Sequence, residues 1–188
     1  MYRVHQPQLK MVIDTPVMEE PTIHVTHRLI AQEIKDWSSK VLEVPSEAFN
    51  GLPPCPYAKK AWAKDRVRMH ITGNIEECLT IKKDCPDDDS VDLVAWTGYE
   101  KMSAEEFDLW LDNQNEKHDG TWIIGFHPDH PADEALEEFE GNGSPEYALI
   151  LIQSLRHLVK SSESIFKRGY YNNYSQFEIN HIKKRNIL

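Results

Sequence analysis

The fold is decided by residues 66–97, which read RVRMHITGNIEECLTIKKDCPDDDSVDLVAWT. From Val67 the stretch alternates apolar and polar residues, which is the pattern of a strand with one covered face. It ends in a more continuously apolar run at 91–97, as expected for a more central strand. Between the two, Asn74–Glu77 approximates a capping box that opens a short helix. The stretch therefore predicts a strand–helix–strand unit.

A second helix and a third strand continue the pattern downstream. Ser103–Glu106 forms a capping box, and the apolar residues after it share one face of a helix that we expect to run to about Lys117. Gly120 ends that helix, and Thr121–Phe126 predicts the third strand. Strands separated by helices predict an α/β protein, with a small sheet of about three to four strands and helices packed on it.

The next predicted element is one long helix. Gly141–Pro145 interrupts the chain, and within it Ser144 suits the N-cap and Pro145 the first turn. We expect the helix to run to about Phe166. Its centre, Tyr147–Leu151, is apolar all round, which indicates a helix that is buried on most of its surface.

The N-terminal residues are predicted to form an arm and a first helix. Residues 1–25 contain prolines and no sustained periodicity, so they are expected to contribute at most one strand, Lys10–Asp14. A helix follows, with Thr26 as its N-cap and an apolar stripe at helical spacing. The predicted organisation is an arm at 1–25, a single α/β domain at 26–169 and a polar, basic tail at 170–188.

Composition favours a globular protein of the cytoplasm. The chain has 188 residues, of which 40% are hydrophobic and 28% charged. Its longest uncharged apolar run, Tyr147–Leu155, is far shorter than the ~20 residues that span a bilayer. The first ten residues contain no apolar signal core. We therefore expect a cytoplasmic location and no membrane partner.

The charge distribution limits the partner classes. The net charge of −10 argues against nucleic acid, because a phosphate backbone must be neutralised by cations. Acidic clusters at 84–92 and 129–140 are expected to be loops, and the region from Arg156 onward is basic. Three cysteines with no pair at CxxC spacing indicate reduced thiols. A small molecule or another protein remains as the partner.

Cys55 is the clearest single candidate for a reactive residue. With Pro56 at the first helical position, Cys55 is expected at the N-cap, where free amides and the helix dipole stabilise a thiolate. Lys59, one turn later, adds positive potential, so we expect a lowered thiol pKa and a nucleophilic or redox-active cysteine. The alternative is a small buried hydrophobic residue. Cys78 is expected in the core, and Cys85 is expected to be inert among aspartates.

A second candidate lies where the third strand ends. His127 and His130, with Asp129 between them, are side chains of the types that bind zinc or non-haem iron. His157 is a possible further ligand. The alternatives are a catalytic histidine without metal and polar residues that cap a turn. No Walker loop, GxGxxG, GxSxG or HExxH motif occurs, so no cofactor is implied beyond a possible metal.

The order of these blocks resembles that of an uncharacterised bacterial family. That family has a Cys-Pro-Phe-Ala-Lys type motif, a Phe-His-Pro strand end and a Ser-Pro-Tyr-Pro segment that leads to Leu-Arg. The corresponding blocks here are Cys55–Lys59, Asp92–Trp96, Phe126–Asp129, Ser144–Tyr147 and Leu155–Arg156. Tyr57 stands in place of the phenylalanine, and Ala148 in place of the second proline. The resemblance covers about residues 52–157, names no reaction, and implies that Cys55, Lys59, His127 and Ser144–Pro145 belong to one site.

Three functions remain open on the sequence. The first is a thiol-dependent enzyme, with Cys55 as nucleophile, His127 as general base or acid and Asp129 as the carboxylate that orients it. The residues expected to hold its small anionic substrate are Lys59, Ser144 and Arg156. The second is a non-catalytic interaction or regulatory protein. The third is an iron or zinc enzyme that uses His127, Asp129, His130 and His157.

Overall fold

Among the residues that the computed structural model describes (20–117, 119–130 and 147–183), four strands form one mixed sheet. The strands are β1 (Val67–Thr72), β2 (Val91–Trp96), β3 (Thr121–Phe126) and β4 (Ala148–Ser154). Their spatial order is β1-β2-β4-β3. β1 and β2 are parallel, whereas β4 is antiparallel to both β2 and β3. The predicted α/β fold with a small sheet is confirmed.

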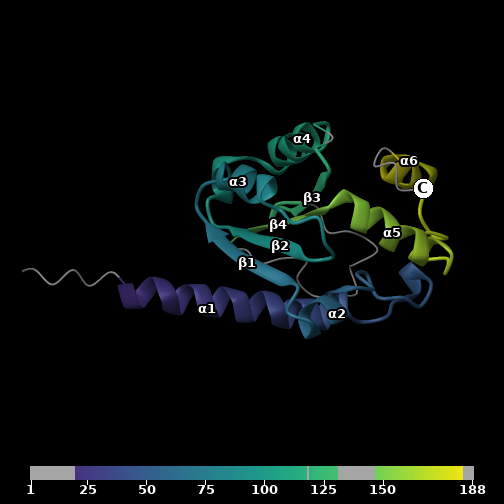
Figure 1. The fold of residues 1–188 in the computed structure, drawn as a ribbon, viewed down its shortest axis with the longest axis horizontal. Helices are drawn as coiled ribbons and strands as arrows, with labels where there is room; N and C mark the ends of the chain where they lie inside the picture. The colour runs from purple at the N-terminus through teal and green to yellow at the C-terminus, as the bar shows by residue number, and fades with distance from the viewer. Residues whose placement is uncertain (1–19, 118, 131–146, 184–188) are drawn as a thin grey trace, which may run out of the picture.

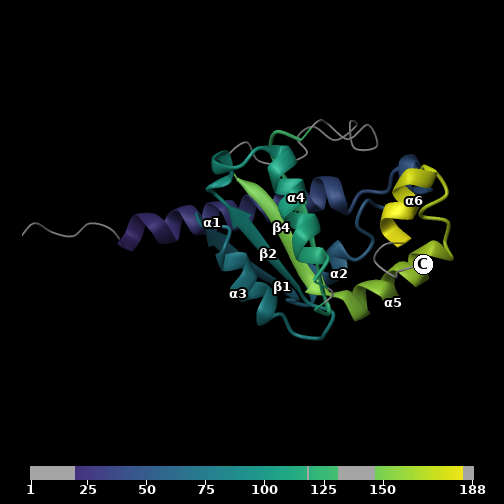
Figure 2. The same ribbon diagram turned by 90° about the horizontal axis from the view of Figure 1, so that it is seen from above.

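Helices cover both faces of this sheet. They are α1 (Glu20–Trp37), α2 (Ala58–Ala63), α3 (Glu77–Lys83), α4 (Ala104–Asn115), α5 (Leu155–Phe166) and α6 (Gln176–Lys183), with a π-helical turn at Ser38–Leu42 and 3₁₀ turns at Glu47–Phe49 and Tyr99–Lys101. α1 and α2 lie on one side of the sheet, and α3 and α4 on the other (Figure 1). α5 leads away from the end of β4 toward α6 (Figure 2).

Alternation along the strands divides the apolar side chains between two cores. Val94 and Ile150 belong to the core under α3 and α4, which also contains the fully buried ring of Phe107. Leu93 points the other way and packs with Ile34 of α1. Because successive residues of a strand face opposite sides, a strand that lies between two helical layers must be apolar at nearly every position.

A third, smaller cluster joins the loop before α2 to the chain after α5. Phe49 stacks on Tyr170 with ring centroids 5.2 Å apart, and the Tyr170 hydroxyl donates to the carbonyl oxygen of Pro54. The Tyr57 hydroxyl donates to the carbonyl oxygen of Ser161 at 2.9 Å. The segment expected to begin a polar tail thus provides a buried aromatic side chain, and α6 follows it.

The prediction of one long helix up to Phe166 is wrong in its first half. Tyr147–Leu151, expected to be the buried centre of that helix, leads into and forms most of β4. Leu151 of β4 pairs with Leu93 on one side and Ile124 on the other. A central strand covered on both faces has the same continuous apolar pattern as a buried helix, so periodicity does not separate the two. The second half of the predicted helix is confirmed as α5.

Two predicted helix starts also differ from the structure. α1 begins at Glu20 rather than after Thr26, which is consistent with Pro21 in its first turn, a position where proline is well tolerated. α2 begins at Ala58, whose amide donates to the Cys55 carbonyl oxygen in a preceding turn. Cys55 is therefore not the N-cap.

The capping box of α4 is confirmed in both directions. The Ser103 hydroxyl accepts from the amide of Glu106, and the Glu106 carboxylate accepts from the amide of Ser103. The predicted strand Lys10–Asp14 and the predicted cap at Ser144 lie outside the described residues. Within the described parts of the chain, the structure contains no helix that is both long and apolar enough to cross a membrane.

Candidate functional site

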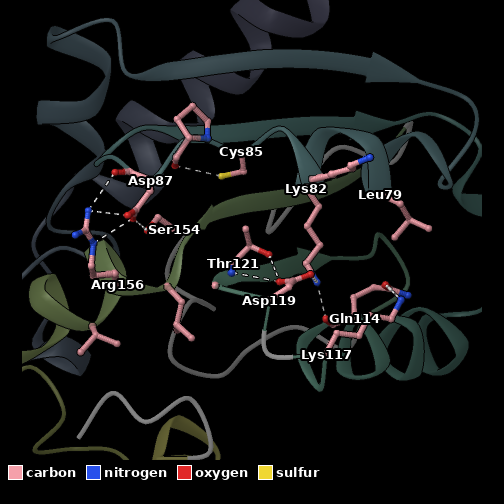
Figure 3. Close-up of a pocket in the computed structure, with 15 residues that line it drawn as sticks. Leu79, Lys82, Cys85, Asp87, Gln114, Lys117, Asp119, Thr121, Ser154 and Arg156 are labelled. Carbon is pink, nitrogen blue, oxygen red and sulfur yellow. Dashed lines mark hydrogen bonds and ion pairs between the residues drawn. The ribbon is translucent and has the colours of Figure 1, made fainter.

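A cleft opens at the end of the sheet where β4 finishes and β3 begins. Its volume is about 830 Å³, which lies within the range of small-molecule sites. The last turn of α3, the loop 84–90, the end of α4 and the first turn of α5 form its walls. Figure 3 shows its polar side chains in two groups, one around Arg156 and one around Lys82.

The first group surrounds the carboxylate of Asp87. The Ser154 hydroxyl donates to Asp87 Oδ1 at 2.7 Å. Arg156 donates to Asp87 Oδ1 from Nε at 3.2 Å, and its Nη2 lies 2.7 Å from Oδ2. The Ser154 hydroxyl and the guanidinium hold the pKa of Asp87 below its ordinary value. The carboxylate thus lies beside Ser154 and Arg156 at the start of α5, where the helix dipole favours an anion.

The second group is built on a buried lysine. Lys82 Nζ donates to the carbonyl oxygen of Gln114 at 2.6 Å and lies 2.9 Å from Asp119 Oδ2. Lys82 is 4% exposed, so this contact caps the last turn of α4 inside the protein. Burial acts to raise the pKa of Asp119, but hydrogen bonds from Thr121 and Lys82 outweigh it and hold that pKa below its ordinary value. Lys117 Nζ donates to the Gln114 side chain at 2.5 Å.

The cleft is more positive than the protein that contains it. Its walls carry four cationic side chains, Lys82, Lys83, Lys117 and Arg156, against the two carboxylates described above. The whole chain has a net charge of −10. The same cleft is also lined by apolar side chains, which include Leu79, Leu155 and Val159. The arrangement suits an organic anion, because cations attract its charged group and the walls cover its apolar part.

His127 lies at the opposite end of the sheet from this cleft. It follows Phe126, which pairs with Leu149 near the start of β4, whereas the cleft lies at the end of β4. Its side chain is fully buried. His127 Nδ1 accepts from the amide of Asp129 at 3.2 Å, which leaves Nε2 to donate to the carbonyl oxygen of Tyr99 at 3.4 Å. Both ring nitrogens are therefore engaged by backbone groups, as in a residue that stabilises a turn.

The neighbouring histidine has the same kind of role. His130 Nδ1 accepts from the amide of His127 at 3.0 Å, and its Nε2 donates to Asp108 Oδ1 at 3.0 Å. The Asp129 carboxylate is exposed and lies 3.8 Å from His127 Nδ1. His157 lies beside Asp87 at the far end of β4. Across residues 20–117, 119–130 and 147–183, no three side chains of His, Cys, Asp or Glu are grouped to hold a metal.

Cys55 and His127 lie in different parts of the fold. The amide of Cys55 donates to the carbonyl oxygen of Leu42, and the α2 helix that follows it packs through Trp62 on the α1 side. His127 packs against Phe107, on the α4 side. Burial raises the pKa of the Cys55 thiol, and the nearby backbone amides do not compensate for it. The lowered pKa expected for a reactive thiol is therefore not found.

All three cysteines are expected to react slowly at neutral pH. Burial also raises the pKa of Cys78 to about 12 and that of Cys85 to about 11, and the thiolate is the reactive form. Iodoacetamide at pH 7.5, followed by mass spectrometry of the peptides, should show slower modification of Cys55 in the folded protein than in urea. Faster modification of Cys55 in the folded protein would restore the thiol hypothesis.

The predicted substrate-binding residues are not brought together as expected. Arg156 lines the cleft, Lys59 is exposed on α2, and Ser144 lies outside the described residues. Asp87 and Lys82, which hold the two polar groups of the cleft, were not predicted as site residues. The acidic cluster at 84–92 was recognised in the sequence, but its pairing with Arg156 depends on β4, which the sequence pattern predicted as part of a helix.

A further polar cluster lies on the α3 side of the sheet, between β1 and β2. Asp92 is 3% exposed and accepts from Arg68 Nε at 2.8 Å and Nη2 at 2.6 Å. His70 Nε2 lies 2.8 Å from the same carboxylate. Burial acts to raise the pKa of Asp92, but these hydrogen bonds outweigh it and the pKa lies below its ordinary value. Arg68, on the polar face of β1, thus neutralises a buried carboxylate.

Comparison of the chain with protein-family models, with curated proteins and with solved structures finds no match. The resemblance to the bacterial family stays a prediction. The function must therefore be argued from the cleft itself.

Proposed function

We propose that this protein binds a small organic anion in the cleft between α3, α4 and the start of α5. The observation that carries the proposal is the set of four cationic side chains in one cleft of a chain with a net charge of −10. The sequence prediction of a small anionic ligand contacted by Arg156 is kept, and so is the expected cytoplasmic location. The Cys55–His127 mechanism is not part of the proposal.

The ligand needs a charged group and an apolar part. Arg156 has the planar guanidinium that binds carboxylate or phosphate through two parallel hydrogen bonds. Lys117 lies in the second polar group, so the ligand meets positive charge from both polar groups of the cleft. Leu155 and Val159 provide an apolar wall from consecutive turns of α5. A phosphate or carboxylate attached to a ring or an alkyl chain meets these requirements.

Phenyl phosphate is a suitable probe, with inorganic phosphate and phenol as its two halves. Isothermal titration calorimetry at pH 7.5 should give a dissociation constant of about 0.1–1 mM for phenyl phosphate. Inorganic phosphate should bind more weakly, because it does not cover the apolar wall, and phenol should show no measurable binding. Arg156→Gln and Lys117→Gln should each weaken phenyl phosphate binding by about tenfold, as expected for a charge-assisted hydrogen bond.

Lys167→Gln is the matched control. Lys167 follows α5 at its other end, about 16 Å along the helix from Arg156, which is beyond the screening length of ~8 Å at physiological salt. This variant should keep the affinity of the unmodified protein. The proposal fails if phenyl phosphate does not bind at millimolar concentration, or if it binds equally well after Arg156→Gln.

A further inference from the structure

The carboxylate of Asp87 is bound in the way that an anionic ligand would be bound. Its two oxygens face two nitrogens of the Arg156 guanidinium, and the Ser154 hydroxyl donates to one of them. The Ser154 side chain is buried, so its direction is set by the fold. This is the paired geometry by which arginine recognises carboxylate and phosphate.

We propose that Asp87 is an internal surrogate for the anionic group of the ligand, which must displace it from Arg156 and Ser154 in order to bind. The inference rests on the proposed function of the cleft and adds that Asp87 competes with the ligand for Arg156 and Ser154. It also specifies the ligand group as an oxyanion that can take two hydrogen bonds from one guanidinium and a third from a hydroxyl.

The Asp87 side chain can move away from Arg156 and Ser154 while the loop 84–90 stays folded. Its side chain is 63% exposed, so a rotation about its side-chain bonds moves the carboxylate into water. The rest of the loop has anchors of its own. Asp88 accepts from both the amide and the hydroxyl of Ser90, and Asp89 pairs with Arg66 before β1. Displacement therefore releases one side chain and leaves the wall of the cleft in place.

The second carboxylate of the cleft lacks this freedom. Asp119 accepts from the amide and the hydroxyl of Thr121, the first residue of β3. It also neutralises Lys82, which is buried and would remain without a counter-charge. Asp119 is therefore structural, and of the two carboxylates Asp87 is the displaceable one.

Occupancy of the subsite by Asp87 lowers the apparent affinity in proportion to the fraction of molecules in which it is bound. For an exposed ion pair with one added hydrogen bond, Asp87→Asn should tighten phenyl phosphate binding by about fivefold. Asp84→Asn removes the same charge from the same loop, at a residue that ends α3 through its backbone. This control should leave the affinity within about twofold of the unmodified protein.

The Arg156→Gln background separates displacement from a general effect of charge. If Asp87 competes for Arg156, then Asp87→Asn combined with Arg156→Gln should bind phenyl phosphate no more tightly than Arg156→Gln alone. Calorimetry of the four proteins completes the cycle. The inference is overturned if Asp87→Asn weakens binding, or if its gain is the same in both backgrounds. Absence of binding in the unmodified protein and in every variant instead overturns the proposed function, and this inference with it.

Discussion

Replacement of Phe107 by alanine should lower the free energy of unfolding by about 4 kcal/mol. The ring is completely buried in the core beneath α3 and α4. It stacks on Trp96 with centroids 5.9 Å apart and lies 5.5 Å from the imidazole of His127. Alanine would leave a cavity that these rigid rings cannot fill by moving. Urea denaturation followed by circular dichroism measures the loss.

Two further variants test this interpretation. Leu109→Ala changes a residue of the same helix that is 64% exposed, and its effect should stay below about 0.5 kcal/mol. Gly125→Ala would place a Cβ atom 2.5 Å from Phe107 Cζ, so it should destabilise the fold by about 2 kcal/mol through overpacking. Combined with Phe107→Ala, the new methyl group enters the cavity. The double variant should then lose less unfolding free energy than the sum of the losses of the two single variants. Additive losses would contradict the packing described for this core.

The second large effect is expected at the buried carboxylate of β2. Arg68→Met should lower the free energy of unfolding by about 2 kcal/mol, because Asp92 would lose its guanidinium partner and keep the hydrogen bond with the His70 imidazole. The value is at the low end for a buried pair, since the Arg68 side chain is 37% exposed and water can enter its place. Arg66→Met is the matched control. It breaks an ion pair with the exposed Asp89 and should change stability by less than about 1 kcal/mol.

Lowering the pH should reduce the difference in unfolding free energy between Arg68→Met and the unmodified protein. The pKa of Asp92 is lower in the folded protein than in the unfolded chain, so its stabilising contribution is complete above the unfolded value of about 4 and is lost as the pH falls through the folded value. Arg68→Met removes the main hydrogen bonds that lower this pKa. Urea titrations at pH 7 and at pH about 3 should therefore give a smaller stability difference between the two proteins at the lower pH. An equal difference at both pH values would contradict the role assigned to this pair.

Local sequence patterns predicted correctly the elements that depend on neighbouring residues alone. β1 alternates because one of its faces meets α1 and the other carries Arg68 and His70. The start of α4 was predicted to the residue because its capping box lies within four consecutive positions. β4 was missed because its sequence is apolar from Ala148 to Ile152. Helices cover both of its faces and strands flank both of its edges, and its two polar residues, Gln153 and Ser154, are adjacent at its end and reveal no period of two.

In the candidate site, too, single residues could be predicted from the sequence but their partners could not. Arg156 was predicted as a contact for an anion because it is a cation. Its partner Asp87 comes from the loop 84–90, which lies beside Arg156 because β4 pairs with β2. Cys55 and His127 had strong local signals, but helix starts and strand ends do not specify which face of a sheet they occupy. The structure places Cys55 before α2, with its amide bonded to the carbonyl oxygen of Leu42, and His127 against Phe107 of α4.

The strand order has a consequence for synthesis on the ribosome. β4 follows β3 in the chain but lies between β2 and β3 in space. Until Ser154 has emerged, β3 lacks its hydrogen-bonding neighbour and the inner edge of β2 is open. The nascent protein must therefore hold apolar strands with unpaired edges while about thirty residues, from the end of β3 to the end of β4, are translated, at ~5–20 residues per second. During those seconds a ribosome-associated chaperone, or the early packing of α3 and α4, must shield the unpaired strand edges.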